Sequence, residues 1–347
     1  MQPSIQNFDR ILHSTIDRKR IFGAVLHVES GDRQLSWNGA AGNMNSASRF
    51  FIASTTKLYV TAALLKLRAL NKIKLTDKII LYLDKGMISN IHHFRGAEYS
   101  AEITIEQLMA HTSGLPDYFQ QKRINGKSLA DEIMAGHDQA WTVEHVMEEV
   151  KQMKPRFAPG TRGKALYSDT NFQLLGKIIE TVTSQTLEDT FIQYIYEPLS
   201  LSHTYLYTNT QDDTPSPLYY KESPIHIPHA MVSFGPDGGL VSTAEELMRF
   251  LRAFFDGTFF PQPYLEELYA WNKIFFPLQY GKGIAKFQLP RIFSPFHSPP
   301  ELIGHSGLSG AFAYYSPKKD VYLCGTVNQI SPPSLSYKLM LQILSLL

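Results

Sequence analysis

The chain has 347 residues, of which 44% are hydrophobic and 19% charged, and its formal net charge is +1. This composition indicates a folded globular protein and excludes a disordered one, while the balanced charge gives no indication of binding to nucleic acid or to an anionic membrane surface. A single cysteine, Cys324, excludes an internal disulfide and any site built from several cysteine ligands.

The N-terminal segment predicts an amphipathic helix and not a secretory signal. Ile5, Phe8, Leu12 and Ile16 follow helical spacing, and charged residues interrupt the apolar run that a signal requires. No stretch approaches the ~18 apolar residues of a bilayer-spanning helix. The chain as written therefore fits a cytoplasmic protein. An exported precursor from which the signal has been removed could have the same sequence, so the compartment stays open.

The elements in chain order predict a sheet that both ends of the chain help to build. Helices are predicted at about residues 5–16, 54–70, 103–109, 142–153, 170–183, 187–195, 244–255 and 334–346, and strands at 21–29, 33–37, 280–288, 301–305, 310–316 and 321–328. Residues 208–236, rich in Pro, Asp and Tyr, predict a long loop or lid.

This order predicts an α+β fold, an α/β/α sandwich in which an antiparallel sheet is flanked by helices. We expect a single domain over residues 1–347. Its sheet subdomain is expected at approximately 1–75 and 238–347, with a mostly helical subdomain inserted at approximately 76–237.

The stretch from Phe50 to Lys57 carries the first chemical motif. An apolar run leads into Ser54, Lys57 follows three residues later, and a long helix rich in Ala and Leu comes next. If the helix begins at Ser54, both side chains face the same side of its first turn, and a desolvated Lys can accept a proton from a Ser hydroxyl. Roughly one such pair is expected by chance in a chain of this size. A second copy, at Ser316–Lys319, predicts only a turn between strands.

Two further motifs follow in the chain, Tyr167-Ser168-Asp169 and His305-Ser306-Gly307. Together with Ser54-Thr55-Thr56-Lys57, and in this order, they resemble the three active-site motifs of the serine β-lactamase and penicillin-binding protein superfamily. The branch they resemble holds class C β-lactamases, DD-carboxypeptidases, D-aminopeptidases and family VIII-type esterases. The resemblance extends from about Phe22 to Asn328 and includes the stretch Leu108–Leu115.

The resemblance implies catalytic roles for Ser54, Lys57, Tyr167 and His305. Ser54 would become acylated, and Lys57 would share its proton and orient the hydroxyl. Tyr167 would act as a base only if a cation lowers its pKa from about 10, and which of Lys57 and Tyr167 takes the proton stays open. His305 is expected on an edge strand, bound to Tyr167 or to a substrate carboxylate, with a pH-dependent charge.

The resemblance also implies residues that bind the oxyanion or the substrate. The N–H groups of Ser54 and Leu308 would form an oxyanion hole, Gly307 would let the strand approach the substrate closely, and Ser306 and Asp169 would line the site.

Asp169 departs from the common pattern of the branch, which has Asn at this position. An Asn amide can donate to a substrate carbonyl, whereas an ionised Asp only accepts. The Asp169 carboxylate would either repel substrates that carry a carboxylate, such as penicillins, or pair with Lys57.

The histidines outside the motifs predict neither catalysis nor metal binding. His111 lies in a loop after a helix, where a structural role is favoured. The others, His92, His93, His226 and His229 among them, are too scattered for a metal site. Neither a metal nor a cofactor is expected.

The sequence therefore predicts a serine hydrolase that forms an acyl-enzyme on Ser54 and acts on an ester or a peptide or amide bond. Its substrate would be a small molecule, a short peptide or an ester, bound by residues 119–140 and 208–236. An aromatic cleft is one possibility there, and a core role for each aromatic residue is another. The aromatic residues concerned are Phe119, Tyr219, Tyr220, Phe234 and Tyr280.

Two alternatives stay open. One is a β-lactamase or DD-carboxypeptidase proper, against which Asp169 argues. The other is a non-catalytic penicillin-binding-like protein that only binds ligands, against which the intact motif residues argue. The oligomeric state is not predicted.

Overall fold

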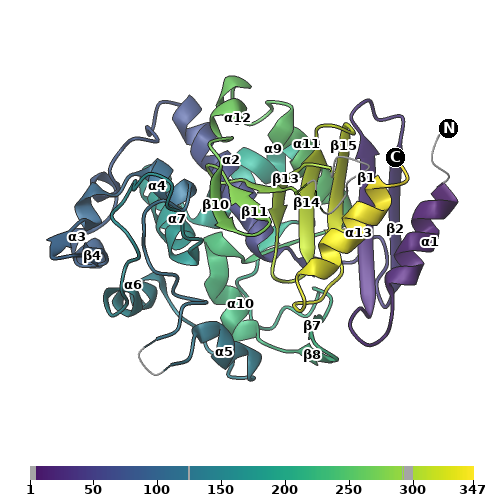
Figure 1. Ribbon diagram of the computed structural model, residues 1–347, viewed down its shortest axis with the longest axis horizontal. Helices are drawn as coiled ribbons and strands as arrows, with labels where there is room; N and C mark the ends of the chain where they lie inside the picture. Colours follow the sequence, from purple (N-terminus) through teal and green to yellow (C-terminus); the bar gives the residue numbers. More distant parts are fainter. Residues whose placement is uncertain (1–4, 124–125, 291, 293–299) are drawn as a thin grey trace.

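An eight-stranded antiparallel sheet forms the centre of the molecule, and both ends of the chain contribute to it (Figure 1). The computed structural model describes residues 5–123, 126–290, 292 and 300–347. In spatial order the strands are β10 (Asn272–Phe275), β11 (Leu278–Tyr280), β12 (Ala285–Phe287), β13 (Leu302–Ser306), β14 (Ala311–Ser316), β15 (Val321–Thr326), β1 (Gly23–Ser30) and β2 (Ser36–Gly42). The N-terminal hairpin thus completes a sheet that the C-terminal third begins.

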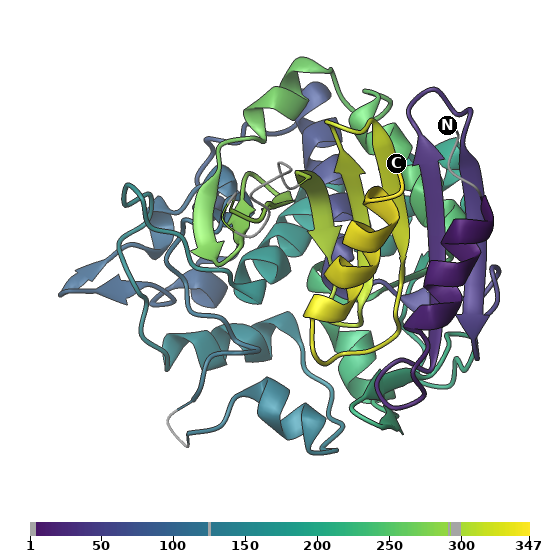
Figure 2. The ribbon, with the colours of Figure 1, turned by 45° about the vertical axis from the view of Figure 1, so that its right-hand side comes forward.

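Helices cover both faces of this sheet. α1 (Ile5–Thr15) and α13 (Ser334–Leu344) lie side by side on one face, as Figure 2 shows, where Phe8 and Leu12 share a buried cluster with Leu339. α11 (Ala244–Phe255) packs on β15, β1 and β14 from the other face. Because successive side chains of a strand point to opposite faces, β1 is apolar on both sides: Leu26 joins the first cluster and Val25 the second. This arrangement confirms the predicted α+β sandwich.

The other helices lie mainly between residues 56 and 267. They are α2 (Thr56–Ala69), α3 (Lys85–Ile88), α4 (Ile105–Met109), α5 (Leu129–Met134), α6 (Val143–Lys151), α7 (Asp169–Thr183), α8 (Leu187–Phe191), α9 (Glu197–Leu199), α10 (Pro228–Phe234) and α12 (Pro263–Glu267). The predicted division into a sheet subdomain and a helical subdomain stays a prediction. None of the helices in the described part of the chain has the length and apolar character needed to cross a membrane.

α2 lies between the sheet and the helical region, and it is buried nearly all round. Every residue from Thr56 to Leu65 is buried, as expected for a helix that is apolar on all faces. It contacts α7 and the short turn Gly235–Asp237 on one side and β13 on another. The first turn of α2 is therefore held by parts of the chain from both regions.

Three smaller sheets complete the fold. β3 (Phe50–Phe51), β9 (Leu240–Ser242) and β6 (Tyr205–Leu206) form a three-stranded sheet just before α2. The hairpins β4 (His93–Phe94) with β5 (Ala97–Glu98), and β7 (Leu218–Tyr220) with β8 (Ser223–Ile225), form the others.

Several predicted elements are confirmed with small shifts of their ends. The N-terminal hairpin forms as β1 and β2, although its second strand begins at Ser36, three residues later than predicted. α4 begins with a capping box between Thr104 and Gln107, and Thr243 caps α11 through its hydroxyl. The copy of the Ser-x-x-Lys motif at Ser316–Lys319 falls in the turn between β14 and β15, as predicted.

Three expectations were wrong. Residues 208–236 are not one long loop: they contain β7, β8 and α10, and Pro228 starts α10 at a position where a missing N–H costs nothing. The single strand predicted at 280–288 is two strands, because the turn around Gly281–Gly283 separates β11 from β12. β13, which carries His305, is not an edge strand but lies between β12 and β14.

Candidate active site

Ser54 lies on a tight turn between a strand and a helix. β3 ends at Phe51, the turn Ala53–Thr55 follows, and α2 begins at Thr56. The chain enters the turn under constraint, because the Ile52 N–H donates to the Leu240 carbonyl at 2.9 Å. Ala53 has φ of +44°, in the left-handed region that side chains disfavour. This strained turn presents the Ser54 hydroxyl at the surface of a cleft.

Lys57 is completely buried, and its ammonium group lies close to three oxygens. Its Nζ donates to Ser54 Oγ at 3.0 Å and to the carbonyl oxygen of Asp237 at 2.5 Å, and it forms an ion pair with Asp169 Oδ1 at 2.8 Å. An ammonium only donates and carries a positive charge, so this set of partners matches the charged form. Asp169 thus pairs with Lys57, the second of the two outcomes expected for this carboxylate.

The charge of Lys57 is stabilised by its acidic neighbours. Burial alone would lower the pKa of Lys57, but the carboxylates of Asp169 and Asp237 outweigh this effect and raise the pKa above its usual value. Lys57 is therefore an ammonium at neutral pH in the resting site, and it is not the neutral amine that the sequence alone suggested as a proton acceptor.

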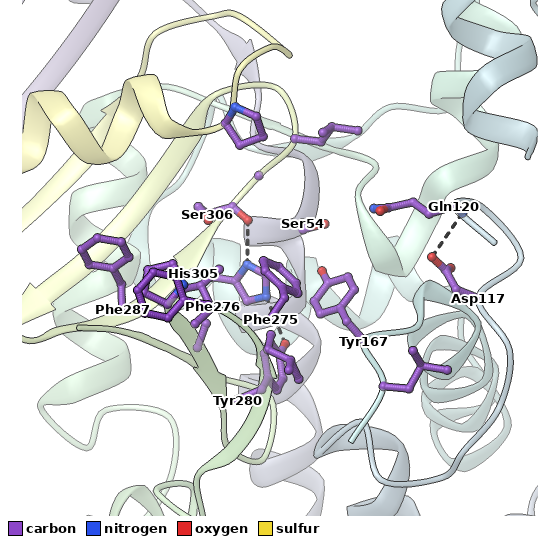
Figure 3. A pocket seen from close by; sticks show the side chains of 18 of the residues that line it. Ser54, Asp117, Gln120, Tyr167, Phe275, Phe276, Tyr280, Phe287, His305 and Ser306 are labelled. Carbon is purple, nitrogen blue, oxygen red and sulfur yellow. Dashed lines mark hydrogen bonds between the residues drawn. The ribbon is translucent and has the colours of Figure 1, made fainter. Parts of the chain in front are cut away.

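Tyr167 precedes α7, and its phenol points toward Ser54 (Figure 3). Lys57 Nζ lies 5.4 Å from the centre of the Tyr167 ring. Burial, reinforced by Asp169, raises the pKa of Tyr167 well above the usual value. The condition for a tyrosinate base, a cation that lowers this pKa, is not met in the resting site, and Tyr167 is a neutral phenol.

His305 lies on β13 beside Tyr280, and the two side chains are hydrogen-bonded (Figure 3). Nδ1 of His305 lies 2.8 Å from the Ser306 carbonyl, which can only accept, so Nδ1 carries the proton. Nε2 therefore accepts from the Tyr280 hydroxyl at 3.0 Å. Of the two expected partners, Tyr167 has its ring centre 6.4 Å from that of His305 and is not the bonded one, and a substrate carboxylate stays a prediction.

The pH-dependent charge expected for His305 is also wrong. Burial and then the charge of Lys57 lower the pKa of His305 to about 3. The imidazole is consequently neutral over the physiological range. Although β13 is an interior strand, its pairing with β12 ends at Gly304, so His305 and Ser306 extend beyond β12 toward the cleft.

Gly307 and Leu308 directly follow β13 and lie next to the Ser54 turn. A Cβ on Gly307 would lie 2.3 Å from the Ile52 carbonyl oxygen and 2.9 Å from Ala53 Cβ, so only glycine allows this contact. Within the described residues, the Leu308 N–H has no hydrogen-bond acceptor. Ser306, in contrast, bonds Tyr337 through its Oγ at 2.7 Å.

Three buried carboxyl groups lie at the site, and the sequence indicated only Asp169. Asp169 and Asp237 act on the charge of Lys57, and the Asp117 carboxyl accepts from the Asp169 N–H at 3.1 Å. Burial and the nearby Asp169 raise the pKa of Asp117 to about 7, and the same causes raise that of Asp237 well above its usual value. Among the described residues, no group of His, Cys, Asp and Glu side chains is arranged to hold a metal ion. Asp117 and Asp237 each lie next to a family-like stretch of sequence, but no sequence signal places them around Lys57.

Two cavities meet at Ser54. The larger is a cleft of about 1830 Å³. Phe275, Phe276 and Phe287 lie on one side of it, and Asp117 and Gln120 lie across from them (Figure 3). Its wall includes Tyr280, which the sequence had suggested for an aromatic cleft.

The smaller cavity, of about 60 Å³, lies beside Ser54 and is lined mainly by apolar side chains. Phe119 and Phe234 line it, as suggested from the sequence, and Asp169 is also part of its wall. Tyr219 instead stacks on Phe22, with ring centres 4.4 Å apart, and it lines neither cavity at Ser54.

The sheet, its helices and the strand–turn–helix at Ser54 define a β-lactamase/transpeptidase-like fold. The chain matches the family described as Beta-lactamase over residues 8–345, and it belongs to this family.

Known relatives and solved structures agree with this assignment. A protein of Escherichia coli (strain K12) named "Putative D-alanyl-D-alanine carboxypeptidase" is 32% identical over 154 residues, which are 44% of this chain and 32% of that protein. The chain thus spans about a third of the length of this curated relative.

Two solved structures cover nearly the whole chain. A D-stereospecific amidohydrolase from Streptomyces sp. has a TM-score of 0.78 at 25% identity, with 97% of this chain and 98% of that chain covered. A D-amino acid amidase from Ochrobactrum anthropi SV3 has a TM-score of 0.77 at 19% identity, with 98% and 100% covered. The second likeness, at this low identity, shows the fold alone.

The contact at Gly307 predicts a sharp difference between two glycine substitutions. Gly307→Ala forces the end of β13 away from the Ser54 turn and is expected to lower the free energy of unfolding by about 1–3 kcal/mol. Gly238→Ala is the matched control, since its Cβ would meet the same turn, at Ala53, at an ordinary 3.6 Å. Thermal unfolding of both variants checks this, and equal melting temperatures would contradict it.

The raised pKa of Asp117 predicts how stability depends on pH. The folded protein holds the Asp117 proton up to about pH 7, whereas the unfolded chain releases it near pH 3.8, the ordinary pKa of an aspartate. Folding therefore binds a proton in this window, and the contribution of Asp117 to stability is lost as the pH rises through it. We expect the difference in melting temperature between wild type and Asp117→Asn to shrink as the pH rises from 4 to 8. A constant difference would contradict this.

Proposed function

We propose that this protein is a serine hydrolase that cleaves an amide or ester bond through a covalent acyl-enzyme on Ser54. One observation carries the proposal: Lys57 Nζ lies 3.0 Å from Ser54 Oγ at the wall of a large cleft, and the Tyr167 phenol points toward the same hydroxyl (Figure 3). A hydroxyl beside groups that can orient it and exchange its proton is the arrangement that covalent catalysis requires.

The protonation states of the site suggest how the proton moves. Because Lys57 donates to Ser54 Oγ, the proton of Ser54 is free to point to the phenol oxygen of Tyr167. As Ser54 Oγ bonds to the substrate carbonyl carbon, its proton passes to Tyr167, and Tyr167 gives its own proton to the leaving nitrogen or oxygen. This exchange needs no tyrosinate, in accordance with the raised pKa of Tyr167.

The other groups at Ser54 have supporting roles in this proposal. The N–H groups of Ser54 and Leu308 stabilise the oxyanion, each contributing on the order of 3 kcal/mol. The Lys57 ammonium holds the attacking oxygen in place. A water molecule then takes the position of the leaving group, and the same proton exchange in reverse releases the acid.

We further propose an amide bond next to a D-configured residue as the preferred substrate, with esters as alternatives. The support comes from the likeness to proteins named as a D-stereospecific amidohydrolase and as a carboxypeptidase of D-alanyl-D-alanine. The small apolar cavity beside Ser54 has room for a short side chain.

Removal of the hydroxyl tests the proposed nucleophile. Wild type is expected to show a burst with activated esters and an acyl adduct on the peptide that contains Ser54, when a panel of esters, D-amino acid amides and β-lactams is examined by mass spectrometry. Ser54→Ala is expected to lose at least ~10³-fold in turnover, and also the adduct. Ser316→Ala, in the second copy of the motif, is the matched control and keeps both. An adduct that persists in Ser54→Ala would refute the proposal.

The alternative function, that of a β-lactamase or DD-carboxypeptidase proper, can be tested with a penicillin. Asp169 replaces the usual Asn donor and keeps negative charge beside the acyl site, so slow labelling by a fluorescent penicillin is expected. Asp169→Asn supplies an amide N–H and removes the carboxylate, and is expected to increase the labelling rate about 10-fold, the effect of roughly one hydrogen bond. Wild type that is labelled as fast as the variant, and turns the penicillin over, would favour the alternative.

A further inference from the structure

His111 is a buried residue directly behind the site. It follows α4 and has φ of +56°, in the left-handed region where His and Asn are among the few residues tolerated. The centre of its ring lies 4.4 Å from that of Tyr167 and 4.4 Å from that of Tyr280. Its position thus puts it in contact with the two phenols that face the cleft.

His111 binds the backbone on both sides of Tyr167. The Leu166 N–H donates to the His111 carbonyl oxygen at 2.9 Å, and the Ser168 N–H donates to His111 Nδ1 at 3.2 Å. The amide of Asn171, one turn into α7, donates to the same Nδ1 at 2.9 Å. The backbone N–H groups of the residues before and after Tyr167 therefore both bind this one residue.

These contacts determine which ring nitrogen carries the proton. Because two N–H donors share Nδ1, this atom must be unprotonated, and the proton lies on Nε2. Nε2 is buried and has no hydrogen-bond partner among the described residues. Burial, followed by the charge of Lys57, lowers the pKa of His111 well below its usual value, so the ring stays neutral.

We propose that His111 is the positioning residue of Tyr167: its carbonyl and its Nδ1 fix the backbone on either side of this tyrosine, so that the phenol reaches Ser54. Only the acceptor at the Nδ1 position is needed for this role, and Nε2 is dispensable. The catalytic consequence rests on the function proposed above, whereas the effect on the position of Tyr167 does not.

Two substitutions separate the two ring nitrogens. In His111→Asn the amide oxygen takes the place of Nδ1, and Asn tolerates the left-handed backbone. In His111→Gln the amide reaches the position of Nε2 and no acceptor remains at Nδ1. We expect His111→Asn to keep ester turnover within about 3-fold of wild type. We expect His111→Gln to lose about 100-fold in kcat with little change in KM, as for a misplaced catalytic group.

The kinetic test can contradict the proposal when each rate is divided by the concentration of active sites. That concentration is measured by titration of Ser54. A purely structural role lowers the melting temperature of both variants and leaves kcat per titrated site unchanged, which would overturn the proposal. A larger loss in His111→Asn than in His111→Gln would also overturn it, since that pattern makes Nε2 the important atom. If wild type itself shows no turnover that depends on Ser54, the proposed function fails, and the structural test below decides on His111.

Crystal structures of the two variants provide that test without any activity. In His111→Gln the Tyr167 hydroxyl is expected to move out of hydrogen-bonding reach of Ser54, whereas in His111→Asn it stays. If the phenol keeps its position in both variants, His111 does not position it. If His111→Gln does not fold, His111→Ala with the same measurement replaces it.

Discussion

The site depends on one buried ammonium, which is hydrogen-bonded to two oxygens and paired with one carboxylate. Lys57 on α2 joins its own turn at Ser54, the start of α7 at Asp169 and the Asp237 carbonyl, which is 180 positions away in sequence. An ion inside a protein without its partners costs several kcal/mol, so any movement that separates these elements is strongly opposed. The charge pair thus fixes the proposed nucleophile against the sheet and the helical region at once.

The same charge sets the protonation of its surroundings. Together with burial it keeps the imidazoles of His305 and His111 neutral, while Asp169 keeps the phenol of Tyr167 protonated. Among the carboxyl groups, burial and the charge of Asp169 raise the pKa of Asp237 and also that of Asp117, which reaches about 7. A second isolated charge in such a buried site costs more free energy than its interactions return. Neutral groups that pass protons from one to the next therefore fit this site better than a strong charged base.

The local sequence was sufficient to predict the helices and strands that have regular residue patterns, and also the order of the motifs. The amphipathic period of α7, the Thr caps of α4 and α11 and the Ser54–Lys57 spacing all predict what the structure contains. The predictions that were wrong concern contacts between residues that are distant in the chain. That β13 is an interior strand depends on β12, and that His305 bonds Tyr280 depends on the register of β11. Asp117 and Asp237 carry no motif, because Asp117 comes to lie beside Asp169, and Asp237 beside Lys57, only through the fold.

Asp169 shows how one departure from the common pattern changes the chemistry. An Asn at this position could donate to the substrate and would leave Lys57 with one fewer counter-charge, whereas the Asp169 carboxylate lies 2.8 Å from Nζ and raises the Lys57 pKa. With Asp169 the ammonium is held more firmly in its charged form, and it is a poorer proton acceptor for Ser54. The phenol of Tyr167 then becomes the more favourable route for the Ser54 proton, and its orientation, which depends on the residues around it, carries more of the proposed catalysis.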